Sequence, residues 1–151
     1  MRFKPVPEPP DTLEELESIR AAVPATPDEN VDCCARLIGH SHVSDRDEAA
    51  DWLTFLRALE LATNGSVGFA RTPRDIDAGH LQAAFRERVA GADAVLEYLE
   101  TTDRPLEVRE VSTQLRGRTT VEEPLERAER LLDWAALLGI VDDEEGGYRP
   151  R

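Results

Sequence analysis

The chain has 151 residues, 40% of them hydrophobic, which is enough to bury the core of one typical domain or two small ones. Its apolar runs fall short of the roughly 18 residues that a membrane span needs, and the first ten residues lack the apolar stretch of a secretion signal. Cys33 and Cys34 are neighbours in sequence and cannot cross-link distant parts of a fold. We therefore expect a cytoplasmic protein without membrane contact.

The charge is strongly negative and evenly spread. The formal net charge is −13, divided into −6 over residues 1–75 and −7 over residues 76–151, and 17 of the 18 bases are arginines. An acid-rich, lysine-poor composition is similar to that of proteins from salt-accumulating haloarchaea, where carboxylates keep the surface hydrated and molar salt screens repulsion within about 3 Å. The alternative is a mesophilic protein from a GC-rich genome.

The chain begins with a proline-rich segment and two helices. Residues 1–10 contain "KPVPEPP", which predicts an extended, polyproline-like lead-in that acts as a spacer; a proline-motif ligand is the alternative. Thr12 and Glu15 have the spacing of a capping box at the start of the first helix, which Pro24 ends. "VDCCARLIGH" predicts a short second helix that stops near Gly39.

A third helix and a hairpin follow. Ser44 and Asp47 have capping spacing, and the residues after them carry one apolar stripe in "SDRDEAADWLTFLRALEL". Two short apolar stretches then flank Asn64 and Gly65, the dipeptide most typical of a hairpin turn. Three helices and a hairpin are therefore predicted within residues 11–75.

The second half has a similar order. Residues 80–100 predict one long helix, bent at Gly91. "LEVREVSTQLRG" predicts a shorter helix, and Thr120 with Glu123 caps a further one, "VEEPLERAERLLDWAALLG". The hairpin "IVDDEEGGYRP" comes last.

The two halves align without gaps at a shift of 79 residues, which places Gly68-Phe69 on Gly147-Tyr148. Between residues 52 and 69 the first half has ten apolar positions, and all but position 67 remain apolar in the second half. A structural repeat explains this better than two unrelated amphipathic helices do.

"WLTFLRALELATNGSVGF" and "LLDWAALLGIVDDEEGGY" resemble the recognition helix and wing of winged-helix proteins, and the whole chain is similar to small acidic haloarchaeal proteins of unknown function. The resemblance implies a mostly α fold with small β-hairpins, built as a tandem winged-helix-like repeat. The expected units are residues 11–75 and residues 76–151, the second beginning with the long packing helix. The resemblance also implies binding of DNA or protein, without implying a reaction.

A DNA-binding winged helix needs cations, because its wing and loops hold phosphates. Those best placed in the sequence, as candidate nucleic-acid contacts, are Arg46, Arg71, Arg74, Arg116 and Arg118. Arg116 and Arg118 are expected in the turn before the last helix. Arg127 and Arg130 each follow a glutamate by four residues, so both are predicted to form pairs within the helix.

The second wing has the opposite charge. Asp142, Asp143, Glu144 and Glu145 are expected at its tip, where they would repel a phosphate backbone. These four acids are instead a candidate surface for a basic or apolar protein partner.

Other chemistries have little support. Cys33, Cys34, His40 and His42 suggest a metal site, but adjacent residues on a helix point about 100° apart and no second ligand pair follows. No phosphate-binding, dinucleotide-binding or nucleophile motif is present. We expect no metal, no cofactor and no enzymatic activity.

Three functions remain open. The primary hypothesis is a non-enzymatic, protein-binding regulatory or adaptor module of winged-helix type. The alternative is a sequence-specific DNA-binding transcription regulator that works at high salt. A weaker third hypothesis is a metal or redox sensor that uses Cys33 or Cys34. A homodimer also remains open, since a tandem repeat can replace a dimer.

Overall fold

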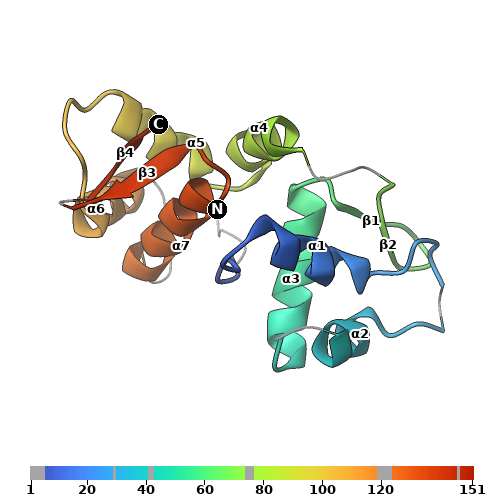
Figure 1. Cartoon of the computed structure of the whole chain (residues 1–151). Coiled ribbons are helices and arrows are strands. Elements are labelled where there is room, and N and C mark those ends of the chain that lie inside the picture. The colour runs from blue at the N-terminus through green and yellow to red at the C-terminus, as the bar shows by residue number, and fades with distance from the viewer. Residues whose placement is uncertain (1–5, 29, 41–42, 74–76, 119–123, 146) are drawn as a thin grey trace. The chain divides into compact units, whose positions relative to one another are not determined.

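Figure 1 shows the computed structural model of the chain, which describes residues 6–28, 30–40, 43–73, 77–118, 124–145 and 147–151. The chain forms two compact units: an N-terminal unit, Pro10–Asp77, and a C-terminal unit that combines Ala78–Arg151 with the residues before Pro10. The proline-rich lead-in therefore groups with the second unit. None of the described helices is long and apolar enough to cross a membrane.

The N-terminal unit has three helices and one hairpin. Its elements are α1 (Leu13–Ala21), α2 (Cys33–His40), α3 (Arg46–Ala58), β1 (Ala62–Asn64) and β2 (Phe69–Arg71). The capping pair of α1 is confirmed, because Thr12 Oγ1 accepts a hydrogen bond from the Glu15 N–H at 3.2 Å. This helix therefore begins where its sequence predicts.

The start of α3 differs from the prediction by one residue. Asp45, in extended conformation, accepts from the Glu48 N–H at 2.8 Å, and Ser44 Oγ donates to the Glu48 carboxylate at 2.9 Å. Asp45 and Glu48 therefore form the cap that was assigned to Ser44 and Asp47. Several acids in "SDRDE" have capping spacing, and the extended backbone of Asp45 selects one of them.

The core of the N-terminal unit is built around α3. Trp52 and Phe55 are both nearly fully buried and meet edge to face, with ring centroids 6.5 Å apart. Leu16 and Ile19 of α1 and Leu37 of α2 are buried as well. The aromatic residues on the stripe therefore serve as core.

The hairpin of the N-terminal unit has a wider turn than its sequence suggests. Asn64 pairs with Phe69, and the Gly65 N–H donates to the Gly68 carbonyl at 3.1 Å. The loop therefore contains four residues instead of a two-residue turn at Asn64-Gly65. On its outer side, the Arg71 N–H donates to the Pro24 carbonyl at 2.8 Å, so the segment after α1 lies against β2.

The C-terminal unit repeats this order after one extra helix. Its elements are α4 (Ala78–Arg88), α5 (Ala92–Glu100), α6 (Val108–Arg118), α7 (Pro124–Leu137), β3 (Val141–Glu144) and β4 (Gly147–Pro150). Leu106, between α5 and α6, forms an antiparallel bridge with Tyr148 of β4. From α5 onward the chain thus has the order helix, bridge residue, helix, helix and hairpin, and Figure 1 shows these helices and the hairpin.

The single long helix predicted over residues 80–100 is wrong. Gly91 has a φ of 91° and stands between α4 and α5, so the chain breaks where only a bend was expected. A left-handed residue cannot continue an α-helix, whereas the apolar pattern runs on because both helices face the same core. The predicted cap of Thr120 and Glu123 lies outside the described residues.

The junction between the last helix and the wing is the same in both units. The Leu61 N–H donates to the Leu56 carbonyl and the Ile140 N–H to the Ala135 carbonyl, each at 2.9 Å. Glu60 and Gly139, which precede these donors, have φ values of 63° and 80°. Each pair of positions differs by the shift of 79 residues that aligns the sequences, so the two halves share backbone structure at this junction.

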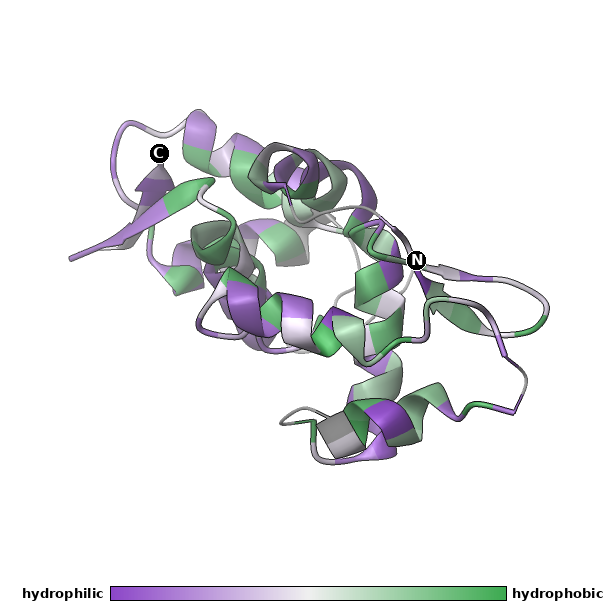
Figure 2. Ribbon diagram, turned by 45° about the vertical axis from the view of Figure 1, so that its right-hand side comes forward, coloured by the Kyte–Doolittle hydropathy of each residue, from purple (hydrophilic) through white to green (hydrophobic). Residues whose placement is uncertain are grey.

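The fold class is confirmed as mostly α with two small antiparallel hairpins in winged-helix order. Figure 2 shows helices that carry both hydrophilic and hydrophobic residues along their length. The hydrophobic members form the core of each unit, with Trp134 and Phe85 among the largest buried side chains of the C-terminal unit.

Gly147 is predicted to be required for the C-terminal wing. Its φ is +133°, and a β-carbon there would overlap the carbonyl group of Leu106, which is bonded to Tyr148. Gly147→Ala should therefore lower the free energy of unfolding of this unit by roughly 3 kcal/mol or more. Urea unfolding in molar potassium chloride, followed by the NMR signal of the Trp134 indole, measures this.

Substitutions at two further glycines distinguish the effect of backbone strain from that of steric overlap. Gly68 has a φ of +147°, but a β-carbon there would meet open space, so Gly68→Ala should lower the free energy of unfolding by about 1 to 2 kcal/mol. A β-carbon at Gly65 also meets open space, and Gly65→Ala should change this free energy by no more than about 0.5 kcal/mol. The Trp52 indole reports both, since it belongs to the N-terminal unit. Equal unfolding midpoints for Gly147→Ala and the wild type would contradict the close approach of Leu106.

Candidate recognition surface

Helix α7 holds the position of a recognition helix in the C-terminal unit, after α6 and before the wing. It buries Leu131, Leu132 and Trp134 in the core and leaves Leu125 and Glu129 exposed. Leu125, in its first turn, is 47% exposed and is one of two large exposed hydrophobic side chains in the described part of the chain.

The hydroxyl group of Tyr148 interacts with acidic residues of α7 and the wing. That hydroxyl donates to Asp133 Oδ1 at 2.8 Å. Burial raises the pKa of Tyr148 first, and the hydrogen bond to Asp133 and the charges of Asp133, Asp143 and Glu129 raise it further. We call Glu129, Asp133 and Asp143, whose charges all act on Tyr148, the acidic face.

The four predicted wing acids have different surroundings. Asp142, Asp143 and Glu144 lie in strand β3 instead of at the tip, and Glu145 follows them in the turn. Asp142 pairs with Arg151 at 2.9 Å, and Glu144 lies 3.6 Å from Arg149. Within the residues that the structure describes, no ion pair engages Asp143 or Glu145, and both residues are exposed.

The predicted nucleic-acid arginines of the N-terminal unit make internal contacts. Arg46 binds both oxygens of Asp32, at 2.9 and 3.3 Å, and this hydrogen bonding lowers the pKa of the Asp32 carboxyl group. Arg71 donates to the carbonyls of Val23 and Ala21, at 2.7 and 3.3 Å, near the C-terminal end of α1. The pattern of charge in the sequence did not reveal these acceptors.

The other three predicted nucleic-acid contacts are Arg74, Arg116 and Arg118. Arg74 lies outside the described residues. Arg116 and Arg118 belong to the last turn of α6, where a turn between helices was expected, and their side chains lie outside the described part. The helix that precedes α7 therefore extends further than its sequence suggested.

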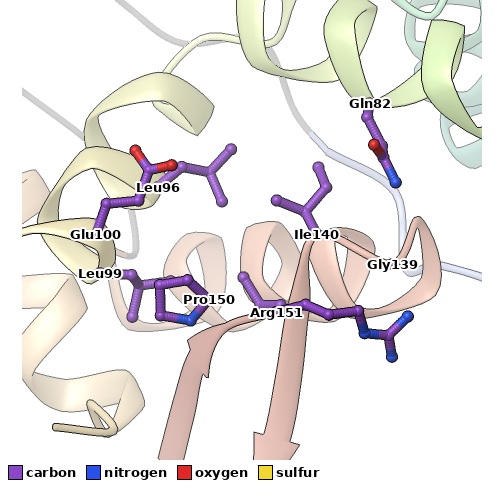
Figure 3. A pocket seen from close by; sticks show the side chains of 9 residues that line it. Gln82, Leu96, Leu99, Glu100, Gly139, Ile140, Pro150 and Arg151 are labelled. Carbon is purple, nitrogen blue, oxygen red and sulfur yellow. The ribbon is translucent and has the colours of Figure 1, made fainter.

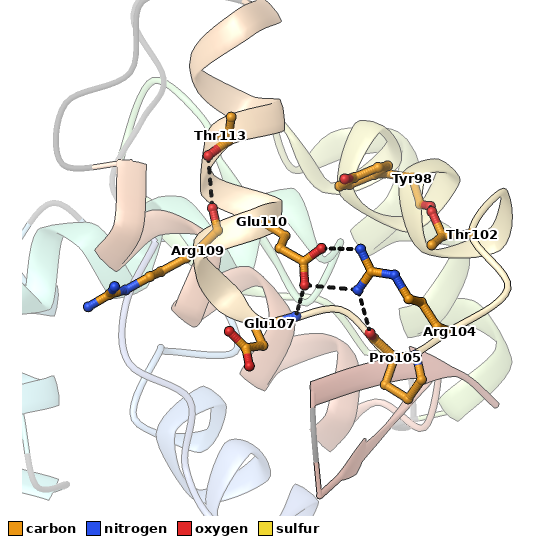
Figure 4. A network of polar contacts seen from close by, with 8 residues as sticks. All are labelled: Tyr98, Thr102, Arg104, Pro105, Glu107, Arg109, Glu110 and Thr113. Atoms are coloured by element: carbon orange, nitrogen blue, oxygen red, sulfur yellow. Dashed lines mark hydrogen bonds and ion pairs between the residues drawn. The ribbon is translucent and has the colours of Figure 1, made fainter.

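Most other described arginines of the C-terminal unit are also engaged. Figure 4 shows Arg104 against Glu110, whose carboxylate also accepts from the Glu107 N–H, while the Arg109 side chain points away from this group. Arg86 binds Asp93 and Glu100, at 2.6 and 2.7 Å. Arginine side chains thus serve mainly as internal cross-links.

The pairing predicted within α7 is confirmed for one arginine. Arg130 pairs with Glu126 at 2.8 Å. Arg127 is buried and donates to the Ala90 carbonyl at 2.6 Å, and burial lowers its pKa to about 10. Its predicted partner, Glu123, lies outside the described residues.

The model of the halobacterial double winged helix domain family matches residues 1–151. The chain belongs to this family. No curated protein and no solved structure matches it. Membership confirms both the resemblance to haloarchaeal winged-helix proteins and the double winged-helix architecture, and it leaves the choice between DNA and protein binding open.

The C-terminal unit of this double winged helix also contains a pocket of about 240 Å³ between α4, α5 and the base of the wing (Figure 3). Leu96, Leu99 and Ile140 supply apolar lining. Gln82 and Arg151 also line it, but they bind the Leu138 carbonyl and Asp142 respectively. The pocket is smaller than most small-molecule sites, and its polar groups are already engaged.

The cysteines do not form a metal centre with other described residues. Within the described part of the chain, no three histidine, cysteine or acidic side chains are grouped to hold a metal ion. Cys33 and Cys34 are half-buried, and burial raises the pKa of the Cys34 thiol. His42 and the side chain of His40 lie outside the described residues.

The environment of Tyr148 predicts a dependence of stability on pH. Its pKa in the folded chain lies above the ordinary value near 10, so its contribution is present below pH 10 and is lost as the pH rises further. The wild type should therefore lose stability more steeply above pH 10 than Tyr148→Phe does. Urea midpoints of both proteins between pH 8 and pH 11.5 measure the difference, and parallel curves would contradict it.

Arg71 is predicted to stabilise the N-terminal unit. Arg71→Gln removes a charged donor from two carbonyls at the end of α1, and the N-terminal unit should lose about 1 to 2 kcal/mol. Arg57→Gln is the control, because Arg57 is exposed on the last turn of α3; it should stay within about 0.5 kcal/mol. Urea unfolding read at the Trp52 indole compares them, and equal losses would refute the structural role.

Proposed function

We propose that this double winged helix is a non-enzymatic regulatory or adaptor module that binds another protein through the C-terminal recognition helix and wing. The observation that supports this most directly is the acidic face. Asp133 accepts the hydrogen bond of the Tyr148 hydroxyl, and the charges of Glu129 and Asp143 act on the same group, on the recognition helix and wing that read DNA in a DNA-binding winged helix.

The acidic face is a poor surface for phosphates. A carboxylate about 6 Å from a phosphate costs roughly 0.7 kcal/mol in water at low salt. Molar salt screens this repulsion, but it equally weakens the attraction of cations that supplies most of the affinity for DNA. High salt therefore removes the repulsion between this surface and DNA without making the binding of DNA favourable.

A basic protein partner with an apolar contact residue fits the surface better. Asp143 and Glu145 supply carboxylates that form no ion pair with other described residues. Leu125, at the start of α7, supplies an exposed apolar side chain. Binding by contact between apolar groups with charges at the rim persists in salt that screens long-range steering.

Charge reversal on the acidic face tests the proposal. Glu129→Arg with Asp143→Arg should reduce recovery of a stoichiometric protein partner about tenfold or more, in crosslinked purification from haloarchaeal cells at native salt. The matched control is Glu87→Arg with Glu97→Arg, which changes the same charge at exposed positions of α4 and α5. DNA in each eluate is sequenced alongside the protein identification.

The alternative, a DNA-binding transcription regulator, is supported by Arg116 and Arg118 in the helix turn just before α7. Discrete enriched DNA sites without a stoichiometric partner would favour it and refute the adaptor proposal. Arg116→Gln with Arg118→Gln should then abolish that enrichment.

A further inference from the structure

Val6 and Pro7 lie against helix α7, at a site that we call the slot and define by Glu126, Arg130 and Trp134. Val6 is 4% exposed, and Pro7 is buried. The Pro7 carbonyl accepts a hydrogen bond from the Trp134 indole N–H at 2.7 Å, and the Val6 carbonyl accepts from the Arg130 guanidinium at 2.9 Å. The segment is therefore held by specific bonds over a sequence separation of more than 120 residues.

The slot follows one stripe of α7. Glu126, Arg130 and Trp134 are spaced by four residues, so they line up along the helix. Glu126 pairs with Arg130 at 2.8 Å and orients the guanidinium towards the Val6 carbonyl. Trp134 is fully buried, and its indole supplies a flat apolar surface with a single donor.

This chemistry selects an extended, proline-containing backbone. Both donors contact main-chain carbonyls, which every sequence has, so selection depends on the conformation of the peptide. Pro7 favours polyproline II geometry and has no N–H that would be left unpaired on burial. Aromatic grooves that bind proline-rich peptides in other proteins use the same combination.

We propose that the Glu126–Arg130–Trp134 slot is a peptide-recognition site whose ligand is residues 6–9 of this chain, and that the same segment of a second copy exchanges into it. The bonds made by the segment are identical in both arrangements. The balance between the two arrangements is set by the effective concentration of the segment that is tethered to its own site. Exchange of such a terminal segment joins two copies without new contacts.

The site is independent of the proposed function. The acidic face runs along the neighbouring stripe of α7, through Glu129 and Asp133, and makes none of the bonds to the segment. Charge reversal at Glu129 and Asp143 should therefore leave the slot occupied, so the two proposals fail separately.

The test uses the full chain labelled with ¹⁵N, whose two indole N–H signals belong to Trp52 and Trp134, one in each unit. Val6→Gly with Pro7→Gly should shift the Trp134 signal and speed its exchange with solvent, leaving the Trp52 signal unchanged. A synthetic peptide of residues 1–11 at millimolar concentration should restore the Trp134 signal. The same peptide with glycine at positions 6 and 7 should bind at least about tenfold more weakly.

Light scattering then tests the second copy as ligand. The wild type should form a dimer whose fraction rises with protein concentration, and the double glycine variant should stay monomeric. A Trp134 signal that does not respond to the variant or to the peptide, or a wild type that stays monomeric at millimolar concentration, would overturn the proposal. If the double variant unfolds the C-terminal unit, the milder Val6→Ala serves with the same readouts.

Discussion

Both units depend on one backbone arrangement, the turn that ends the last helix and starts the wing. The Leu61 and Ile140 N–H groups reach back to carbonyls five residues earlier, and the residue before each takes a left-handed conformation. Gly139 adopts it freely, whereas Glu60 bears a cost of about 1 kcal/mol or more that the surrounding structure offsets. The turn directs buried residues of the helix and the first strand into one core.

The order of elements was predictable because burial repeats with the period of each element. The apolar stripe of α3 continues into β1 in the same way that α7 continues into β3, and both were predicted from apolar spacing together with capping and turn residues. Positions that depend on one backbone angle were not predictable. Asp45 caps α3 instead of Ser44, and Gly91 divides a helix whose apolar pattern is continuous, since sequence patterns report faces and not dihedral angles.

The candidate site was predictable in its charge and not in its contacts. The acids of the second wing were identified, but the interaction of one of them, Asp143, with Tyr148 alongside Glu129 and Asp133 requires the fold. Arg71 was assigned to phosphates because its charge is visible in the sequence, whereas its carbonyl acceptors lie 48 and 50 residues away. The bonds of Trp134 and Arg130 to the lead-in span 127 and 124 residues, beyond any local pattern.

The use of charge in this protein follows from the distance over which each interaction acts. Arg46, Arg86 and Arg104 bind carboxylates through short contacts, and molar salt weakens such contacts less than long-range interactions. Arginines can therefore stabilise the fold of an acidic protein through ion pairs within the chain. Steering of a distant polyanion is lost under the same conditions. The hydrogen bonds from the Trp134 indole and the Arg130 guanidinium to residues 7 and 6 are also short contacts, which salt weakens less than long-range steering.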